Sequence, residues 1–285
     1  MSGLAFLAAG IVSSSLGAAF NENLVKNPSF EAFAAQTNGP LSVGGLAGKY
    51  NLGDWITTGT LTLDRYDGSF GPTTGTPAGA GVYYLFGTAS ASSTVEQDCD
   101  LSFAAAEIAA GQTTFQLSAF LGSWKIDGTV PSPTPQDDIA TLTLTFLDTV
   151  NAVISTTSIV GPNYPIEVGA PLVNGNFQAF FARAGAVPPT AVKAHVSVLL
   201  RRDPTAIASN FNNANADMVN LSLFAPPACP GDLTGDGQVN TTDLAKLLSA
   251  YGVHGSNLAQ DINHDGVVNT LDLAALLGHF GATCT

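Results

Sequence analysis

The sequence is poor in charged residues, and those that it has are mostly acidic. Only 11% of the 285 residues are charged, and 9 Lys and Arg stand against 22 Asp and Glu, which gives a net charge of -13. Nucleic acids and anionic membranes are bound through clusters of basic side chains. No basic stripe occurs anywhere in the chain, so we expect no nucleic-acid partner.

Long hydrophobic runs are also lacking. A transmembrane helix needs about 20 consecutive apolar residues, and the apolar stretch Leu4–Val12 is much shorter. Small residues follow it as far as Ala19, as in the hydrophobic region and cleavage zone of a signal peptide, although no Lys or Arg precedes the run. We expect a signal peptide over residues 1–19, secretion and no membrane span. The alternative is an ordered N-terminal strand or helix.

Cysteine is scarce, with three in the chain. Cys99 keeps phase with Val95, Leu101 and Phe103, so we expect it to face the core as an inert thiol. Cys229 and Cys284 bracket the C-terminal segment, and an oxidising compartment would let them form a disulfide. The alternative is two unpaired thiols.

Catalytic motifs are absent as well. The chain has no G-x-S-x-G, no H-E-x-x-H and no phosphate-binding glycine loop, and His195 is the only histidine before His254. A glycosidase needs two carboxylates across the scissile bond, and none of the Glu residues lies in a recognisable catalytic motif. We therefore predict a non-catalytic protein. A polysaccharide-degrading enzyme with an unrecognised active site stays open, because a carboxylate pair formed in space leaves no sequence signature.

From residue 24 to 224 the chain shows short runs in which apolar and polar residues alternate. Examples are Thr141–Asp148, Thr114–Gly122, His195–Leu200 and Met218–Phe224. Alternation with period two, rich in Thr and branched residues, is typical of half-buried strands. Many such runs between turn signals predict a β-sandwich or barrel, and the one helical candidate is Ala104–Gly111.

Four segments of this region resemble strands of galactose-binding-like jelly rolls found in carbohydrate-binding modules. They are Asn23–Glu31, Phe115–Trp124, Asp137–Asp148 and Asn212–Phe224, and they also resemble extracellular bacterial proteins of the PEP-CTERM type. The resemblance implies a mainly β chain with a jelly-roll sandwich over residues 20–225, in a secreted or cell-surface bacterial protein. Because one fold serves many functions, it does not identify a ligand.

The same resemblance implies two sites. A structural calcium between the first and last strands would be held by Glu31 and Asp217, which are otherwise a strand end and a turn residue. A glycan would stack on aromatic rings, and we take as candidates Trp124, in a loop after a strand, with Trp55, Tyr66 and Tyr164.

A stiff linker separates this region from the C-terminus. Residues 226–231 contain Pro226, Pro227 and Pro230, which hold a chain extended and cannot continue a sheet. We expect a second domain over residues 232–285.

That domain contains two copies of a short acidic sequence, DLTGDGQVNTTD at Asp232–Asp243 and DINHDGVVNTLD at Asp261–Asp272. An EF-hand loop takes oxygens from positions 1, 3, 5, 7, 9 and 12, with glycine at position 6. The pattern predicts one Ca²⁺ in each loop, with Thr234 making the first site the weaker. The expected ligands are Asp232, Thr234, Asp236, Gln238, Asn240 and Asp243 in the first copy, and Asp261, Asn263, Asp265, Val267, Asn269 and Asp272 in the second.

Each loop leads into an amphipathic helix, while the helix that precedes an EF-hand loop is missing. The apolar stripes are Leu244, Leu247, Leu248 and Tyr251 in the first copy, and Leu273, Leu276, Leu277 and Phe280 in the second. We expect the two units to pack face to face in pseudo-twofold fashion and to fold only when calcium neutralises their carboxylates. His264 is expected to be solvated, with His254 and His279 on the surface.

Duplicated loop-and-helix units of this kind resemble the dockerin type I domain. The resemblance implies a cohesin-like partner, contacted by the helix faces and by loop positions ten and eleven, here Thr241, Thr242, Thr270 and Leu271. Apart from Lys246, the basic residues often found along such helices are absent, which argues against a standard cohesin. We expect a calcium-binding protein that binds a glycan or attaches to an extracellular surface. The alternatives are a self-associating surface or filament subunit and the enzyme considered above.

Overall fold

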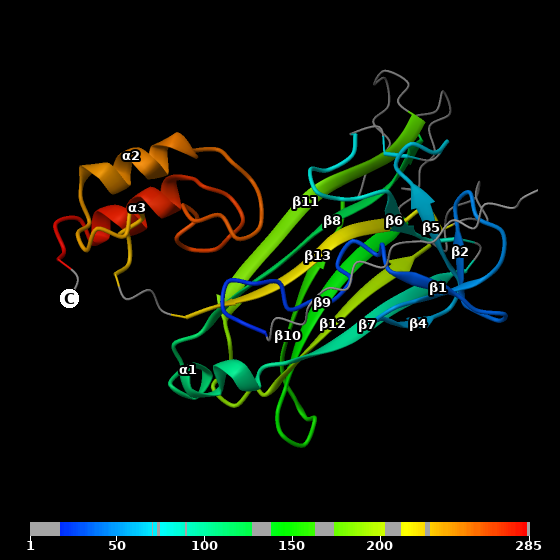
Figure 1. The fold of residues 1–285 in the computed structure, drawn as a ribbon, viewed down its shortest axis with the longest axis horizontal. Coiled ribbons are helices and arrows are strands. Elements are labelled where there is room, and N and C mark those ends of the chain that lie inside the picture. The colour runs from blue at the N-terminus through cyan, green and yellow to red at the C-terminus, as the bar shows by residue number, and fades with distance from the viewer. Residues whose placement is uncertain are drawn as a thin grey trace, which may run out of the picture.

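The computed structural model describes residues 18–69, 71–72, 75–88, 90–126, 138–162, 174–202, 212–225 and 229–283. A two-sheet β-sandwich and a small helical module lie side by side (Figure 1). Nearly all of the expected signal peptide lies outside the described residues. Within them, no helix combines the length and the apolar character that a membrane span requires.

The larger sheet has eight strands, in the order β1-β3-β2-β5-β6-β13-β8-β11. All its pairings are antiparallel except β2 with β5. Its strands are β1 (Phe33–Ala35), β2 (Leu41–Val43), β3 (Tyr50–Leu52), β5 (Leu61–Arg65), β6 (Tyr83–Phe86), β8 (Thr114–Ile126), β11 (Asn174–Ala186) and β13 (Asn215–Phe224).

The smaller sheet has five strands, in the order β10-β9-β12-β7-β4. Its strands are β4 (Ile56–Thr58), β7 (Ser92–Asp100), β9 (Ile139–Leu147), β10 (Val153–Val160) and β12 (Lys193–Arg201). The mainly β sandwich expected from the sequence is confirmed.

The alternating runs form strands because one side of each lies in the core. In β9 the side chains of Leu142, Leu144 and Phe146 are buried. On the other side, Thr143 Oγ1 lies 3.0 Å from the hydroxyl of Ser158 on β10. The two sheets meet in this core, where the rings of Phe115 and Phe146 lie 5.3 Å apart.

The helical candidate in the sandwich is confirmed as a short element. A 3₁₀ turn at Ser102–Ala104 leads into α1 (Ala105–Ala109), which buries Ile108. Cys99 is also buried and is a free thiol. Burial, together with the nearby carboxylate of Asp98, raises its pKa to about 12, as expected for an inert packing residue.

The C-terminal module consists of two equivalent halves. Helices α2 (Thr241–Ser249) and α3 (Thr270–Gly278) each come at the end of one acidic loop, and within residues 229–283 no helix leads directly into either loop. Two isolated antiparallel β-bridges connect the halves reciprocally. Gln238 of the first loop pairs with Thr283 after α3, while Val267 of the second pairs with His254 after α2. This reciprocal pairing agrees with the pseudo-twofold packing expected from the repeat.

The apolar stripes of these helices are only half buried, contrary to expectation. The buried core of the module is small, consisting of Val239, Leu247, Val268 and Leu276, with Leu244 and Leu273 packed against it. Because two short helices cover only one side of each other, the far half of each stripe is exposed. The exposed residues are Leu248, Tyr251, Leu277 and Phe280.

Cys229, at the start of the module, is disulfide-bonded. Cys99 is free, and Cys284, the remaining cysteine of the chain, lies outside the described residues. A disulfide here stabilises the module by restricting its unfolded state.

We expect the sandwich to depend on its inter-sheet core. Replacing the fully buried Leu144 with alanine should lower the free energy of unfolding by about 3 kcal/mol, because the change leaves a cavity. Denaturant unfolding would measure the loss. The matched control is Val153→Ala in β10, where the side chain is 66% exposed and a change below about 0.5 kcal/mol is expected. Equal effects of both variants would contradict this account of the core.

Candidate metal centre

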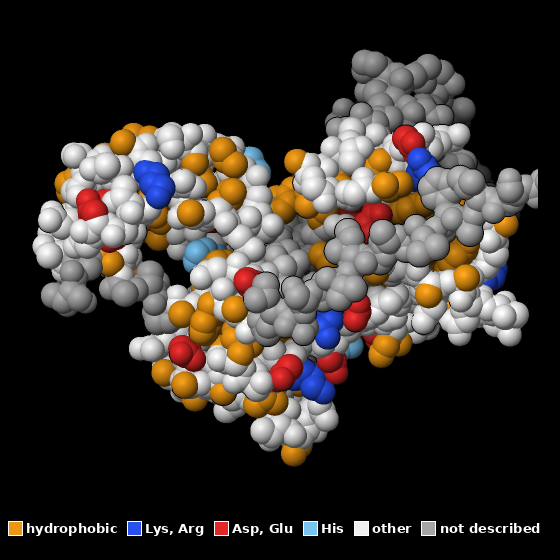
Figure 2. Space-filling view, viewed as in Figure 1, with side chains coloured by type: hydrophobic (Ala, Val, Ile, Leu, Met, Phe, Trp, Pro, Cys, Tyr) orange, Lys and Arg blue, Asp and Glu red, His pale blue; other side chains and the backbone are white. Residues whose placement is uncertain are grey.

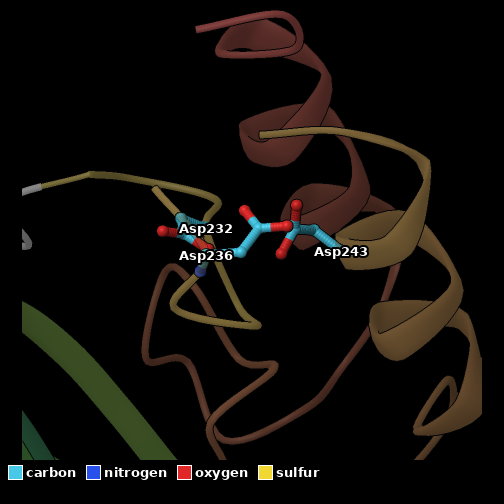
Figure 3. Close-up of side chains that lie close together, drawn as sticks. All are labelled: Asp232, Asp236 and Asp243. Atoms are coloured by element: carbon cyan, nitrogen blue, oxygen red, sulfur yellow. The ribbon is translucent and has the colours of Figure 1, made fainter. Parts of the chain in front are cut away.

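The structure gathers the acidic side chains of each repeated loop into one cluster. Asp232, Asp236 and Asp243 each direct a carboxylate oxygen into a space where these atoms lie within 4.8 Å of one another (Figure 3). The equivalent residues of the second copy, Asp261, Asp265 and Asp272, form a matching group.

In the first loop, backbone amides hold the leading carboxylate in place. Asp232 accepts hydrogen bonds from the backbone N–H groups of Gly235 at 2.7 Å, Asp236 at 3.2 Å and Gly237 at 2.8 Å. Gly237 has a φ of 82°, so the glycine at position 6 makes the left-handed turn that the loop requires.

The closing carboxylate of the first loop comes from the helix. Asp243 lies in the first turn of α2 and accepts the N–H of Asn240 at 2.9 Å, as one half of a capping box. Its other oxygen accepts from the hydroxyl of Thr234 at 2.9 Å. Helix start and cation loop are therefore built from the same residues.

Asn240, expected as the ninth-position ligand, contacts the acidic group, since its side-chain amide donates to Asp236 at 3.3 Å. Its side-chain oxygen accepts the N–H of Thr242 at 2.7 Å and so caps α2. Asn269 does the same for α3, accepting the N–H of Leu271 at 2.7 Å. The side-chain oxygens of both residues are therefore engaged by a helix.

The second loop repeats this arrangement. Asp261 accepts the N–H groups of Asp265 at 3.0 Å and Gly266 at 2.7 Å. Asp272 accepts those of Asn269 at 2.8 Å and Asn263 at 3.2 Å. The equivalence of the two loops thus extends from the sequence to individual hydrogen bonds.

The electrostatics of the two leading carboxylates differ. Burial, reinforced by the negative charges of Asp272 and Asp265, raises the pKa of Asp261 to about 6 against the effect of its amide donors. At Asp232 desolvation acts in the same direction, but the amide hydrogen bonds outweigh it and the pKa lies below its ordinary value. The second loop therefore holds its charge in a drier environment than the first.

The donor chemistry of both loops fits a hard divalent cation. Each group supplies three carboxylates from one short loop, and hard cations such as Ca²⁺ prefer oxygen ligands. The remaining expected ligands lie in the same loops, Thr234, Gln238 and Asn240 in the first and Asn263, Val267 and Asn269 in the second. These acidic groups are therefore suited to hold a metal.

The two carboxylates expected to hold a cation in the sandwich also have protein partners. Glu31 accepts the backbone N–H groups of Val82 at 2.9 Å and Tyr83 at 2.7 Å. Asp217 is buried in β13, where burial raises its pKa well above the ordinary value. Both carboxylates thus have structural roles, and the calcium expected between them stays a prediction.

The aromatic candidates fall into different environments. Trp55 is 4% exposed and packs against Phe30, so its ring offers no face to a sugar, contrary to expectation. Tyr66 is partly buried and donates its hydroxyl to Asp217 at 2.6 Å. Trp124 belongs to β8, but its side chain lies outside the described part of the chain, as does the whole of Tyr164.

A row of residues across the larger sheet was missed by the sequence reasoning. Strand register places Phe120 of β8 opposite both Asp217 of β13 and Phe180 of β11. The rings of Phe120 and Phe180 lie 5.5 Å apart, and those of Tyr66 and Tyr84 lie 5.1 Å apart. The alternation predicted the strands, but only strand pairing places Phe120 beside Phe180.

The expectation that His264 is solvated is wrong. Its ring stacks on Phe224 at the end of β13, with centroids 3.6 Å apart and an angle of 13° between the planes. Burial accordingly lowers its pKa. The sequence held one sign of this contact. Position four of the loop is Gly235 in the first copy but the aromatic His264 in the second. His254 and His279 are exposed, as expected.

Comparison with known proteins identifies the C-terminal module. Residues 230–280 match the family model of the dockerin type I domain, the family that the duplicated loops and helices resemble. No curated protein matches the chain.

Several solved structures are similar to part of this chain. The enzymatically active domain of tailspike protein 4 from bacteriophage CBA120 is 16% identical with a TM-score of 0.38, over 71% of this chain and 21% of that domain. A CBM4 structure is 13% identical with a TM-score of 0.32, over 70% of this chain and 99% of that one. A family 16 carbohydrate-binding module is 10% identical with a TM-score of 0.30, over 50% of this chain and 77% of that one. This chain thus spans about a fifth of the tailspike domain.

Chelation should unfold the helical module and leave the sandwich intact. Without a cation the clustered carboxylates repel one another, and the small buried core opposes this only weakly. We expect EDTA to lower the helical circular dichroism signal of the full chain and excess Ca²⁺ to restore it. Excess Mg²⁺ is the control, since that ion prefers a smaller octahedral site. An unchanged helical signal in EDTA would contradict the metal assignment.

Proposed function

We propose that this chain is an extracellular attachment protein. Its C-terminal module folds around two Ca²⁺ ions and binds a cohesin-like protein on a cell or scaffold surface, while its sandwich binds a polysaccharide. The single observation that carries the proposal is the pair of equivalent three-carboxylate groups within a segment that matches the dockerin type I family.

Calcium is the cation that this loop chemistry favours. Loop spacing, the glycine at position 6 and an all-oxygen donor set are those of Ca²⁺ sites. Thr234 stands where the second copy has Asn263, and its hydroxyl faces Asp243 in the first group. We expect this hydroxyl to be the poorer ligand and the first site to bind more weakly.

A partner surface on the module is supported by its exposed apolar residues. Leu248 and Leu277, at equivalent positions of α2 and α3, are each 51% exposed. Tyr251, Leu271 and Phe280 are exposed nearby, and hydrophobic side chains are seen over the outside of the module in Figure 2. Large apolar side chains left exposed on so small a module are suited to bind a protein partner.

Residues at loop positions ten and eleven are also available to a partner. Thr241, Thr242, Thr270 and Leu271 are all exposed. They begin the two helices, so a protein that contacts the helix faces would meet them as well. This agrees with the docking mode that the dockerin resemblance implies.

The polysaccharide-binding role is supported by the outer face of the larger sheet. Phe120 and Phe180 are only partly buried there. Rings offer stacking faces to sugars. We therefore place the glycan against these two rings.

Capture of a protein partner should depend on the exposed leucines. We expect Leu248→Ser combined with Leu277→Ser to reduce binding to a panel of cohesin domains by about tenfold or more, as loss of central apolar anchors does. Surface plasmon resonance in Ca²⁺ would measure it, with the helical circular dichroism unchanged. Ala245→Ser, at an exposed position on α2, is the control. Failure of the unaltered chain to bind any cohesin would remove this partner.

Retention on polysaccharide should depend on the aromatic row. Phe120→Ala is expected to weaken binding of the full chain to insoluble polysaccharides by about tenfold, because it removes a stacking face. Pull-down against a panel of such polysaccharides would show it. The control is Ile56→Ala on the smaller sheet, where the side chain is 67% exposed. If the unaltered chain is retained no better than on blank resin, the glycan part of the proposal fails.

A further inference from the structure

One side chain of the sandwich reaches into the second acidic loop. Gln116 lies on β8 and is fully buried. Its amide nitrogen donates to Asp261 Oδ2 at 3.3 Å and to the carbonyl of His264 at 3.0 Å. Its amide oxygen accepts the N–H of Asn257 at 3.1 Å. A single residue of the sandwich therefore holds both the leading carboxylate and the backbone of this loop.

The contacts around Gln116 are close. His264 stacks on Phe224, and the turn of the loop at Gly266 packs on β11. A Cβ atom placed on Gly266 would lie 2.4 Å from the Cβ of Ala182, so no side chain fits there. The loop and the sheet thus form one continuous packed surface.

Among the residues that the structure describes, no hydrogen bond joins the sandwich to the first loop. A Cβ placed on Gly235, the counterpart of His264, would meet nothing within 4 Å. Asp232 is only partly buried, whereas Asp261 is 1% exposed. The two loops share their internal hydrogen bonds, so contact with the sandwich is the main difference between them.

We propose that the sandwich forms part of the second calcium site, with Gln116 as a positioning residue for Asp261. This inference rests on the proposed calcium binding. A neutral amide that donates to a metal-binding carboxylate fixes its orientation and leaves its charge intact, and loss of such a partner costs about 10- to 100-fold in metal affinity. Calcium at the second loop then favours docking of the two domains, and docking favours calcium by the same factor.

The docking also limits which surface of the module a partner can reach. Because the second loop packs against the sandwich, the first loop and the outer faces of α2 and α3 are the surface left for a partner. Calcium then also fixes the direction in which the sandwich extends from that partner.

Calcium titration of the full chain tests the proposal one site at a time. Asp236→Asn weakens the first site and leaves the second to be measured, and Asp265→Asn does the reverse. In the Asp236→Asn background, Gln116→Met should weaken calcium binding by about tenfold or more. In the Asp265→Asn background, the same substitution should change nothing. Isothermal titration calorimetry measures both.

A second variant, in the module, distinguishes loss of this contact from a folding defect that Gln116→Met causes in the sandwich. His264→Gly places in the second loop the residue that the first loop has, and glycine accepts the positive φ of 57° at this position. It removes the stacking on Phe224 and should also weaken only the second site. Small-angle X-ray scattering should show the unaltered chain compact in Ca²⁺ and the Gln116→Met, His264→Gly double variant extended.

The outcomes separate the inference from the proposed function. Calcium binding at neither loop of the unaltered chain would remove the proposed function. Unchanged affinity of the second site in both variants would overturn only the role of the sandwich. Equal losses at the two sites would also overturn it, because they would place the effect on the fold as a whole.

Discussion

Crowded negative charge is the constraint on which the C-terminal module of this protein depends. Each loop brings three carboxylates within 4.8 Å of one another, while the module that contains both loops buries only four hydrophobic side chains in its core. Burial of a few apolar side chains contributes a few kcal/mol, and like charges at this spacing oppose it. Backbone amides and capping boxes relieve part of the repulsion, and a bound cation would relieve the rest.

The sandwich, by contrast, has a large hydrophobic core. Its two sheets bury alternating residues of long strands, which leaves the outer face of the larger sheet for other tasks. One end of that face carries the aromatic row of Phe120 and Phe180, and Gln116, two pleats further along β8, contacts the second loop. A glycan and the helical module would therefore occupy neighbouring parts of one surface.

The duplication provides two nearly equal units, and the rest of the chain makes them unequal. The capping boxes, the glycine turns and the exchanged bridges are shared by both copies. Where the first copy has Gly235 in open space, the second has His264 stacked on the sandwich. One copy thus packs against the sandwich, while the matching position of the other copy does not.

The sequence by itself determined the features that depend on neighbours along the chain. Period-two alternation fixed strands such as β9, and loop spacing fixed the carboxylates from Asp232 to Asp243. Tertiary structure alone decided the rest, because those contacts join residues far apart in the sequence. Trp55 lies in the core, half of each leucine stripe is exposed, and His264 meets Phe224. Gln116 and Asp261 are 145 residues apart in the sequence, and no local pattern records a hydrogen bond that exists only once two domains pack together.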